Sequence, residues 1–170
     1  MKKLLIAAML SLLLTGCGAP EAFETMSDEY RVPDTPTQRP ILVQLPENAA
    51  VTTVQNDSEG CLYLCEDFSV AVQTLESGDM DETLRSITGY PREKLTVMQT
   101  QVGDATQYEC VFASAGEGGD QVGRTLILDD GSYHYTLTLL ADADEAGKLT
   151  ETWQKILDSV RLGSTVTVEE

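Results

Sequence analysis

The chain has 170 residues, of which 11 are Lys or Arg and 28 are Asp or Glu, and its formal net charge is −17. This excess of negative charge argues against nucleic acid and anionic lipid headgroups as direct partners, because their phosphates would be repelled. Hydrophobic residues make up 42% of the chain. That fraction is too high for a protein disordered throughout, and the length suits one domain with a real core.

The first residues have the pattern of a secretory signal. Lys2 and Lys3 precede an apolar run from Leu4 to Leu14 that only Ser11 interrupts, and the run is too short for a transmembrane helix. We therefore expect residues 1–16 to be a signal peptide. Removal of this segment, with its two lysines, leaves nine basic and 28 acidic residues, so the net charge of the remaining chain is −19.

The tetrad Leu14-Thr15-Gly16-Cys17 resembles the lipobox of bacterial lipoproteins. The resemblance implies that a diacylglycerol is transferred to the Cys17 thiol, that the chain is cut before Cys17, and that lipid holds the protein on the extracytoplasmic side of a cell membrane. Two acyl chains anchor a protein stably, since each buried CH₂ contributes ~0.8 kcal/mol. The alternative is an ordinary secreted protein with a chance cysteine at this position.

Residues 17–48 have the composition of an extended, lipid-anchored linker. Five of the six prolines lie in this segment, which is also polar and acidic over much of its length. Only Ile41–Leu45 is apolar enough to form a first strand that docks on the domain.

Residues 49–162 are expected to form a single domain. In its first half, alternating apolar residues predict strands over 50–55, 62–64 and 68–75. A helix is expected over 80–88, where Asp79 supplies the N-terminal cap and Gly89 ends it.

In the second half, strands are predicted over 95–102, 106–115, 124–128 and 133–140. Asp129-Asp130-Gly131-Ser132, between two apolar runs, is a strong hairpin signal. A long amphipathic helix is expected to begin near Asp142 or Asp144 and to end by Gly163. Its apolar stripe consists of Leu149, Trp153, Ile156, Leu157 and Val160. Residues 163–170 are expected to be an acidic tail.

Successive strands joined by short turns must be antiparallel, so the fold class is α+β: a β-sheet meander packed by a short middle helix and a long C-terminal helix. A meander followed by a helix that closes with Trp153-Gln154-Lys155-Ile156-Leu157-Asp158-Ser159-Val160-Arg161-Leu162 resembles the PsbP-like and DcrB-like α/β/α sandwich. Several bacterial lipoproteins are similar to this fold. The resemblance implies a non-enzymatic envelope protein, and it carries over no site residue.

Three cysteines follow Cys17. Cys61 and Cys65 would be about 13 Å apart on one extended strand, beyond the reach of a disulfide. Cys65 with Cys110 is the preferred candidate pair, because both lie in or beside predicted strands with apolar neighbours. Three buried free thiols are an equally weighted alternative.

A glycine-rich segment follows the strand that ends near residue 115. It lacks the Gly-Lys-Ser/Thr of a phosphate-binding loop, and its acids would repel phosphate. We expect a flexible connection that could serve as a recognition loop. Its candidate residues are Gly116, Glu117, Gly118, Gly119 and Asp120.

No catalytic residue, cofactor site or metal site is assigned. His134 is the only histidine, and it is expected to be a semi-exposed strand residue beside Thr136 and Thr138. The acid clusters match no calcium loop, although weak calcium binding stays open. The sequence thus predicts a membrane-anchored extracytoplasmic lipoprotein, not an enzyme, that binds or scaffolds an unidentified envelope protein. A small-ligand or cation-binding envelope lipoprotein is the alternative.

Overall fold

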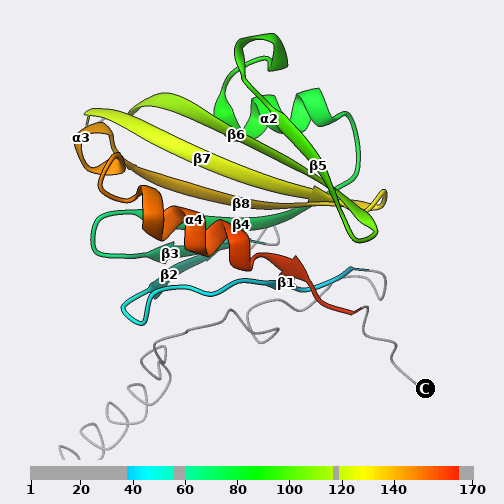
Figure 1. The fold of residues 1–170 in the computed structure, drawn as a ribbon, viewed down its shortest axis with the longest axis horizontal. Helices are drawn as coiled ribbons and strands as arrows, with labels where there is room; N and C mark the ends of the chain where they lie inside the picture. The colour runs from blue at the N-terminus through cyan, green and yellow to red at the C-terminus, as the bar shows by residue number, and fades with distance from the viewer. Residues whose placement is uncertain (1–37, 56–59, 117–118, 165–170) are drawn as a thin grey trace, which may run out of the picture.

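The computed structural model describes residues 38–164, except for 56–59 and 117–118. Seven antiparallel strands form one sheet in the order β2-β3-β4-β8-β7-β6-β5, and β1 pairs with β9 in a separate ribbon (Figure 1). The strands are β1 Ile41–Leu42, β2 Ala50–Gln55, β3 Gly60–Leu64, β4 Ser69–Glu76, β5 Met98–Val102, β6 Ala105–Gly116, β7 Gly119–Asp129, β8 Tyr133–Asp142 and β9 Arg161–Leu162. The helices are α2 Met80–Thr88, η2 Arg92–Lys94, α3 Ala143–Ala146 and α4 Thr150–Ser159.

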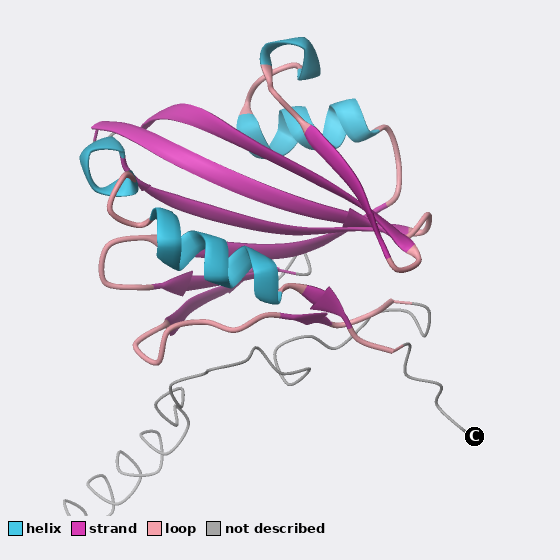
Figure 2. Cartoon of the chain, viewed as in Figure 1, coloured by secondary structure: helices cyan, strands magenta, loops and turns pink. Residues whose placement is uncertain are grey.

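The two longer helices lie on opposite faces of the sheet, with α4 on the near face in Figure 2 and α2 on the far one. Successive side chains along each strand point alternately to the two faces of the sheet, so each strand contributes to the packing under both helices. On β4, Val70 and Val72 are buried in the core beneath α4, while Ala71 between them lies on the other face. The α+β class and the antiparallel meander are therefore confirmed.

The helix α2 has the bounds that its capping residues predicted. Asp79 Oδ1 accepts a hydrogen bond of 2.9 Å from the backbone N–H of Asp81, which satisfies one free donor at the helix start. Gly89 ends the helix with φ 77°, a conformation in which a side chain would be strained. Leu84 is the fully buried residue of the helix and packs with Cys110 and Ile127.

The C-terminal helix is shorter than expected. The four-residue α3 is separated from α4, because Gly147 and Lys148 interrupt the segment and the apolar stripe begins only at Leu149. On α4, Trp153, Ile156 and Leu157 are 3–4% exposed and point from the helix into the main core, as predicted. Val160 lies beyond the helix end, where the backbone is already extended toward β9.

The segment before β2 is part of the domain rather than free linker. Ile41 and Leu42 pair with Leu162 and Arg161, and Ile41, Val43 and Leu45 are at most 5% exposed. The strand expected over 41–45 therefore does dock, and the packed part of the described chain includes residues before the domain boundary at 49 that we expected. Burial of these alternating side chains holds the segment on the domain, and the extended backbone that the neighbouring prolines favour is compatible with a strand.

Candidate functional site

The strand β5 forms an open edge of the sheet. It is last in the strand order, all five of its residues are exposed, and no strand in the described part of the chain pairs with its outer side. Met98 is 57% exposed, Val102 is 46% exposed, and Val111 on the neighbouring β6 is 58% exposed. We call Met98–Val102 the β5 edge. Large apolar side chains gathered at an open edge are unusual, because such edges invite pairing with other chains.

The apolar residues of the β5 edge lie on the face that α4 covers elsewhere. Met98 pairs with Glu109, and Glu109 pairs with Leu126, which is buried in the main core. The helix α4 does not cover β5, and polar side chains lie on the sheet between the helix and this strand. Arg124 forms an ion pair with Glu109 and donates from Nη2 to Gln154 Oε1 of α4 at 2.7 Å.

The turn between β5 and β6 sets which backbone groups are free. Gly103 takes the first turn position with φ 62°, and Val102 pairs with Ala105 across the two-residue turn. Because such a hairpin closes on a hydrogen-bonded pair, Met98, Thr100 and Val102 bond to β6. Gln99 and Gln101 therefore direct their backbone N–H and C=O groups outward.

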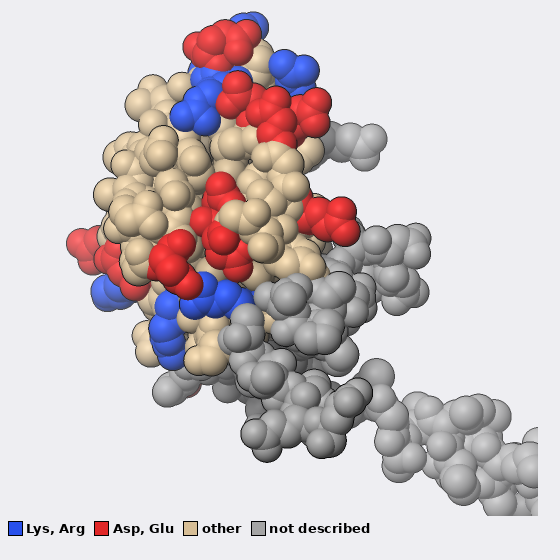
Figure 3. Space-filling model, turned by 90° about the vertical axis from the view of Figure 1, so that its right-hand side faces the viewer, with Lys and Arg blue, Asp and Glu red and all other residues tan. Residues whose placement is uncertain are grey.

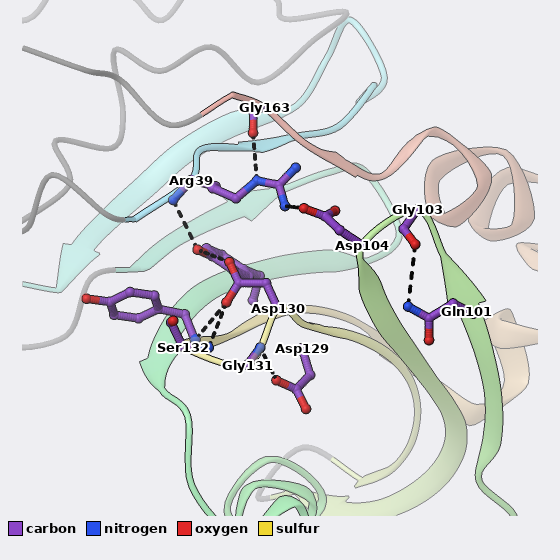
Figure 4. Close-up of polar contacts among 11 residues, drawn as sticks. Arg39, Gln101, Gly103, Asp104, Asp129, Asp130, Gly131, Ser132 and Gly163 are labelled. Atoms are coloured by element: carbon purple, nitrogen blue, oxygen red, sulfur yellow. Dashed lines mark hydrogen bonds and ion pairs between the residues drawn. The ribbon is translucent and has the colours of Figure 1, made fainter.

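A polar cluster lies at the same end of the sheet as this turn (Figure 4). Arg39 donates from Nη1 to Asp104 Oδ2 and from Nε to the Gly163 carbonyl, each at 2.9 Å. Its backbone N–H donates to Tyr135 Oη at 3.0 Å, and that hydroxyl donates to Asp130 Oδ2 at 3.0 Å. The cluster fixes the N-terminal segment and the C-terminal β9 to the two hairpins.

Two side chains in the cluster have shifted pKa values. Burial raises the pKa of Tyr135 well above its ordinary value, and the neighbouring Asp130 carboxylate adds to that effect. The hydrogen bond from Arg39 lowers the pKa of the exposed Asp104. The Arg39 side chain, the Arg39 backbone N–H and the Tyr135 hydroxyl all donate within the cluster, so the arrangement is that of a clasp that joins distant segments of the chain.

The expectation of a semi-exposed His134 is wrong. The ring is 1% exposed, because α2 packs over this end of β8 and its Thr83 Oγ1 lies 2.8 Å from Nδ1. Burial lowers the pKa of His134, against the opposing effect of Asp129 and Asp130. Ser77 Oγ and Asp129 Oδ1 both approach Nε2, at 3.4 and 3.8 Å.

This arrangement differs from a hydrolase triad. In a triad the nucleophile and the carboxylate bond to opposite nitrogens of the imidazole. Here Ser77 and Asp129 share Nε2, while Nδ1 is occupied by a threonine of α2. His134 therefore joins α2 to the hairpin β7–β8, and its geometry is that of a packed core residue.

The candidate disulfide between Cys65 and Cys110 is absent. Both are free thiols, Cys65 packs against the core beneath α4, and Cys110 packs beneath α2 on the other face of the sheet. Burial raises the pKa of each thiol to about 11. The sequence could not reveal this separation, because it depends on which face each strand residue takes.

The glycine-rich segment is mostly strand. β6 continues to Gly116 and β7 begins at Gly119, which pair with each other. Gly123 lies within β7, where an added Cβ would meet the Phe112 ring at 2.3 Å. This close packing is why a glycine is needed there. Of the predicted recognition loop, Gly116, Gly119 and Asp120 thus belong to a hairpin, while Glu117 and Gly118 fall outside the described residues.

Cys17 and the rest of the signal and lipobox also fall outside the described residues. Within residues 38–164, apart from the two gaps, no helix has the length and apolar character needed to cross a membrane. The same residues contain no group of three or more His, Cys, Asp or Glu side chains placed to hold a metal ion.

Charge is unevenly distributed over the surface. Figure 3 shows acidic side chains outnumbering basic ones on the face that it views, with a tract of uncharged surface between the charged groups at the top and those lower down. The five residues of the β5 edge carry no charge, in a chain of which 23% is charged. The edge therefore combines exposure, apolar character and neutrality.

No family model and no curated protein sequence matches the chain, whereas solved structures do. PsbP (CyanoP) from Synechocystis sp. PCC 6803 aligns over 88% of this chain and 99% of its own, with 11% identity and a TM-score of 0.58. LpqN, involved in cell envelope biogenesis of Mycobacterium tuberculosis, aligns over 77% of this chain and 87% of its own, with 12% identity and a TM-score of 0.52.

The Saccharomyces cerevisiae Ran-binding protein Mog1p aligns over 74% of this chain and 91% of its own, with 11% identity and a TM-score of 0.50. At these identities the likeness concerns the fold and not the site residues. The expected architecture is nevertheless confirmed. The chain has the PsbP-like α+β fold, which it shares with an envelope-associated protein and a Ran-binding protein.

Proposed function

We propose that this protein is a non-catalytic lipoprotein, anchored through Cys17 on the extracytoplasmic side of a cell membrane, whose domain binds an envelope protein through the β5 edge. The fold neighbours support a binding role, since one is described as Ran-binding and another as involved in cell envelope biogenesis. The geometry around His134 supports a non-catalytic role, because nucleophile and carboxylate share one ring nitrogen.

The observation that carries the proposal is the exposure of the β5 edge. Natural proteins usually protect such an edge with charged residues, proline or a covering element. This edge has no charge and no proline, and it places Met98 and Val102 in solvent. An extended partner segment could add a strand here, with backbone bonds for affinity and apolar contacts for specificity.

The anchor is tested by Cys17→Ala. The variant should leave the membrane fraction, because the thiol that carries the lipid is gone. Cys65→Ala is the matched control, since it also removes a thiol and should leave the protein membrane-bound. A Cys17→Ala protein that still sediments with membranes would contradict the anchor.

The binding surface is tested by a photo-crosslinking amino acid at Gln99 in cells. The matched control carries the same group at Glu82, which is also exposed but lies on α2. A reproducible adduct at position 99 that is absent at position 82 is the expected result. Gln99→Pro should abolish the association, because proline removes an outward N–H while the ladder to β6 is kept. Equal labelling at both positions would contradict a specific edge.

A further inference from the structure

The amino-acid sequence of the β5 edge is nearly symmetric: Met98-Gln99-Thr100-Gln101-Val102 places an apolar residue at each end, a Gln inside each and Thr at the centre. We infer that the partner of this edge is a second copy of the same chain, paired antiparallel across a two-fold axis at Thr100. This inference rests on the proposed function, because it names the partner of the same edge.

The free backbone groups fit this register. With Thr100 on the axis, Gln99 of one copy lies opposite Gln101 of the other, and these are the residues whose N–H and C=O groups point outward. Both pairs related by the axis can then form complete hydrogen-bonded pairs. A register shifted by one residue would place an outward group of one copy opposite an inward group of the other. An axis at Gln99 or Gln101 would keep outward groups opposite each other, but only the axis at Thr100 pairs all five residues of the edge with each other.

The side chains fit the same register. Met98 of each copy lies opposite Val102 of the other, on the face that continues the α4 side of the sheet. These side chains are 57% and 46% exposed in the single chain, and pairing removes part of that apolar surface from water. On the opposite face, the Gln99 amide meets the Gln101 amide of the second copy, a neutral pair that can exchange hydrogen bonds.

Charge is the main obstacle to self-association, since each copy carries −19 once residues 1–16 are removed. The contact avoids this obstacle locally. None of its five residues is charged, and the carboxylates nearest along the ladder are already paired. Glu109, opposite Met98, is held by Arg124, and Asp104, two residues after Val102, is held by Arg39 at 2.9 Å.

One five-residue strand per copy is a small contact, so the dimer is weak for a protein free in solution. Confinement of both copies to one membrane raises their effective concentration without any new contact. The lipid anchor and the self-pairing edge therefore complement each other, and the dimer is expected mainly on the membrane.

The test places a cysteine on the proposed axis. Thr100→Cys, in lipidated full-length protein reconstituted in phosphatidylcholine vesicles, should form a disulfide-linked dimer under mild oxidation, because the two thiols face each other in a non-hydrogen-bonded pair. Gln99→Cys and Gln101→Cys are the matched controls. Each alone should crosslink at least tenfold more slowly, whereas a mixture of the two should recover fast crosslinking.

All variants carry Cys65→Ala, which removes the half-buried thiol, while Cys61 and Cys110 are buried. Equal rates for the three single variants, or a monomer in every case, would overturn the self-pairing. If Thr100→Cys stays monomeric while the crosslinker at position 99 captures a different protein, the self-pairing is wrong and the proposed function stands. If position 99 captures nothing, both fail.

Discussion

Two neighbouring regions on one face of the sheet differ in burial: one is covered by α4 and the other is exposed to solvent. On β7 and β8, the side chains beneath α4 are buried in the main core, as Leu126 and Leu137 are at 2% and 1% exposure. One and two strands further along the same face, Val111 and Met98 are more than half exposed. The backbone ladder is continuous across both regions, so the difference comes from the layer above the sheet.

The limit between the two regions is polar. Arg124 and Glu109 are 15% and 12% exposed, and Arg124 also bonds Gln154 at the rim of α4. The ion pair lies beside the middle of α4, where it satisfies both charges at the side of the helix that faces the uncovered β5. The comparison teaches that apolar alternation alone does not define the core of this domain, because the reach of α4 decides which apolar residues are buried.

The largest expected effect separates the two regions directly. Trp153→Ala should lower the free energy of unfolding by about 3–5 kcal/mol, because it empties space beneath α4 and removes the edge contact with Phe68, whose ring centroid lies 6.3 Å away. Val111→Ala, on the bare side, should cost less than about 0.5 kcal/mol. Guanidinium denaturation measures both, and similar losses would mean that the regions are equally packed.

A glycine pair tests how tightly the far face is packed. Gly123→Ala should cost about 1–3 kcal/mol, because its Cβ would meet Phe112 at 2.3 Å and the ring would have to move. Gly147→Ala is the control, since nothing lies within 4 Å and its backbone is helical. It should leave stability unchanged or raise it by about 0.4–1 kcal/mol. An unchanged Gly123→Ala protein would contradict a fixed Phe112.

The ion pair between Arg124 and Glu109, which separates the two regions, can be removed by mutation. Glu109→Gln should cost about 1–2 kcal/mol, because Arg124 then keeps its charge in a largely buried place without a carboxylate. Lys148→Ala, which breaks the exposed pair with Glu145, should give no measurable change. A thermal unfolding series compares the two, and a silent Glu109→Gln variant would show that the pair is not what stabilises the rim of α4.

The smallest effect is a pH dependence on the α2 face. Burial lowers the pKa of His134 in the folded chain, so the unfolded chain takes up a proton more readily. The resulting stability is fully present above about pH 6.5, the ordinary pKa of histidine, and is lost as the pH falls through the lower pKa of the folded chain. Denaturation at pH 7.5 and 5.5 should show a larger loss for the native protein than for His134→Gln. Equal losses would mean that other groups govern this range.

Local signals allowed much of the fold to be predicted. The bounds of α2 follow from Asp79 and Gly89, and the hairpin at Asp129–Ser132 follows from the Asp-Gly turn, because caps and tight turns act over a few residues. Trp153 was correctly placed in the core, since its helical stripe has a clear period.

The remaining features depend on contacts that are distant in the chain. The pairing of β1 with β9 joins residues 41–42 to 161–162, and no local pattern indicates it. The burial of His134 depends on α2 folding over its face, and the separation of Cys65 from Cys110 depends on the faces their strands present. The β5 edge was likewise invisible, because its alternation looks like that of any half-buried strand.

The clasp at Arg39 has a mechanical consequence. Any pull transmitted along the chain from its N-terminal side passes through Arg39, which is held by bonds to Tyr135, Asp104 and Gly163. Gly163 also donates to the Pro40 carbonyl at 2.8 Å, so the load is shared with the C-terminal β9. Tension at a tether would thus be shared among β9 and the two hairpins β5–β6 and β7–β8, and would not fall on one strand alone.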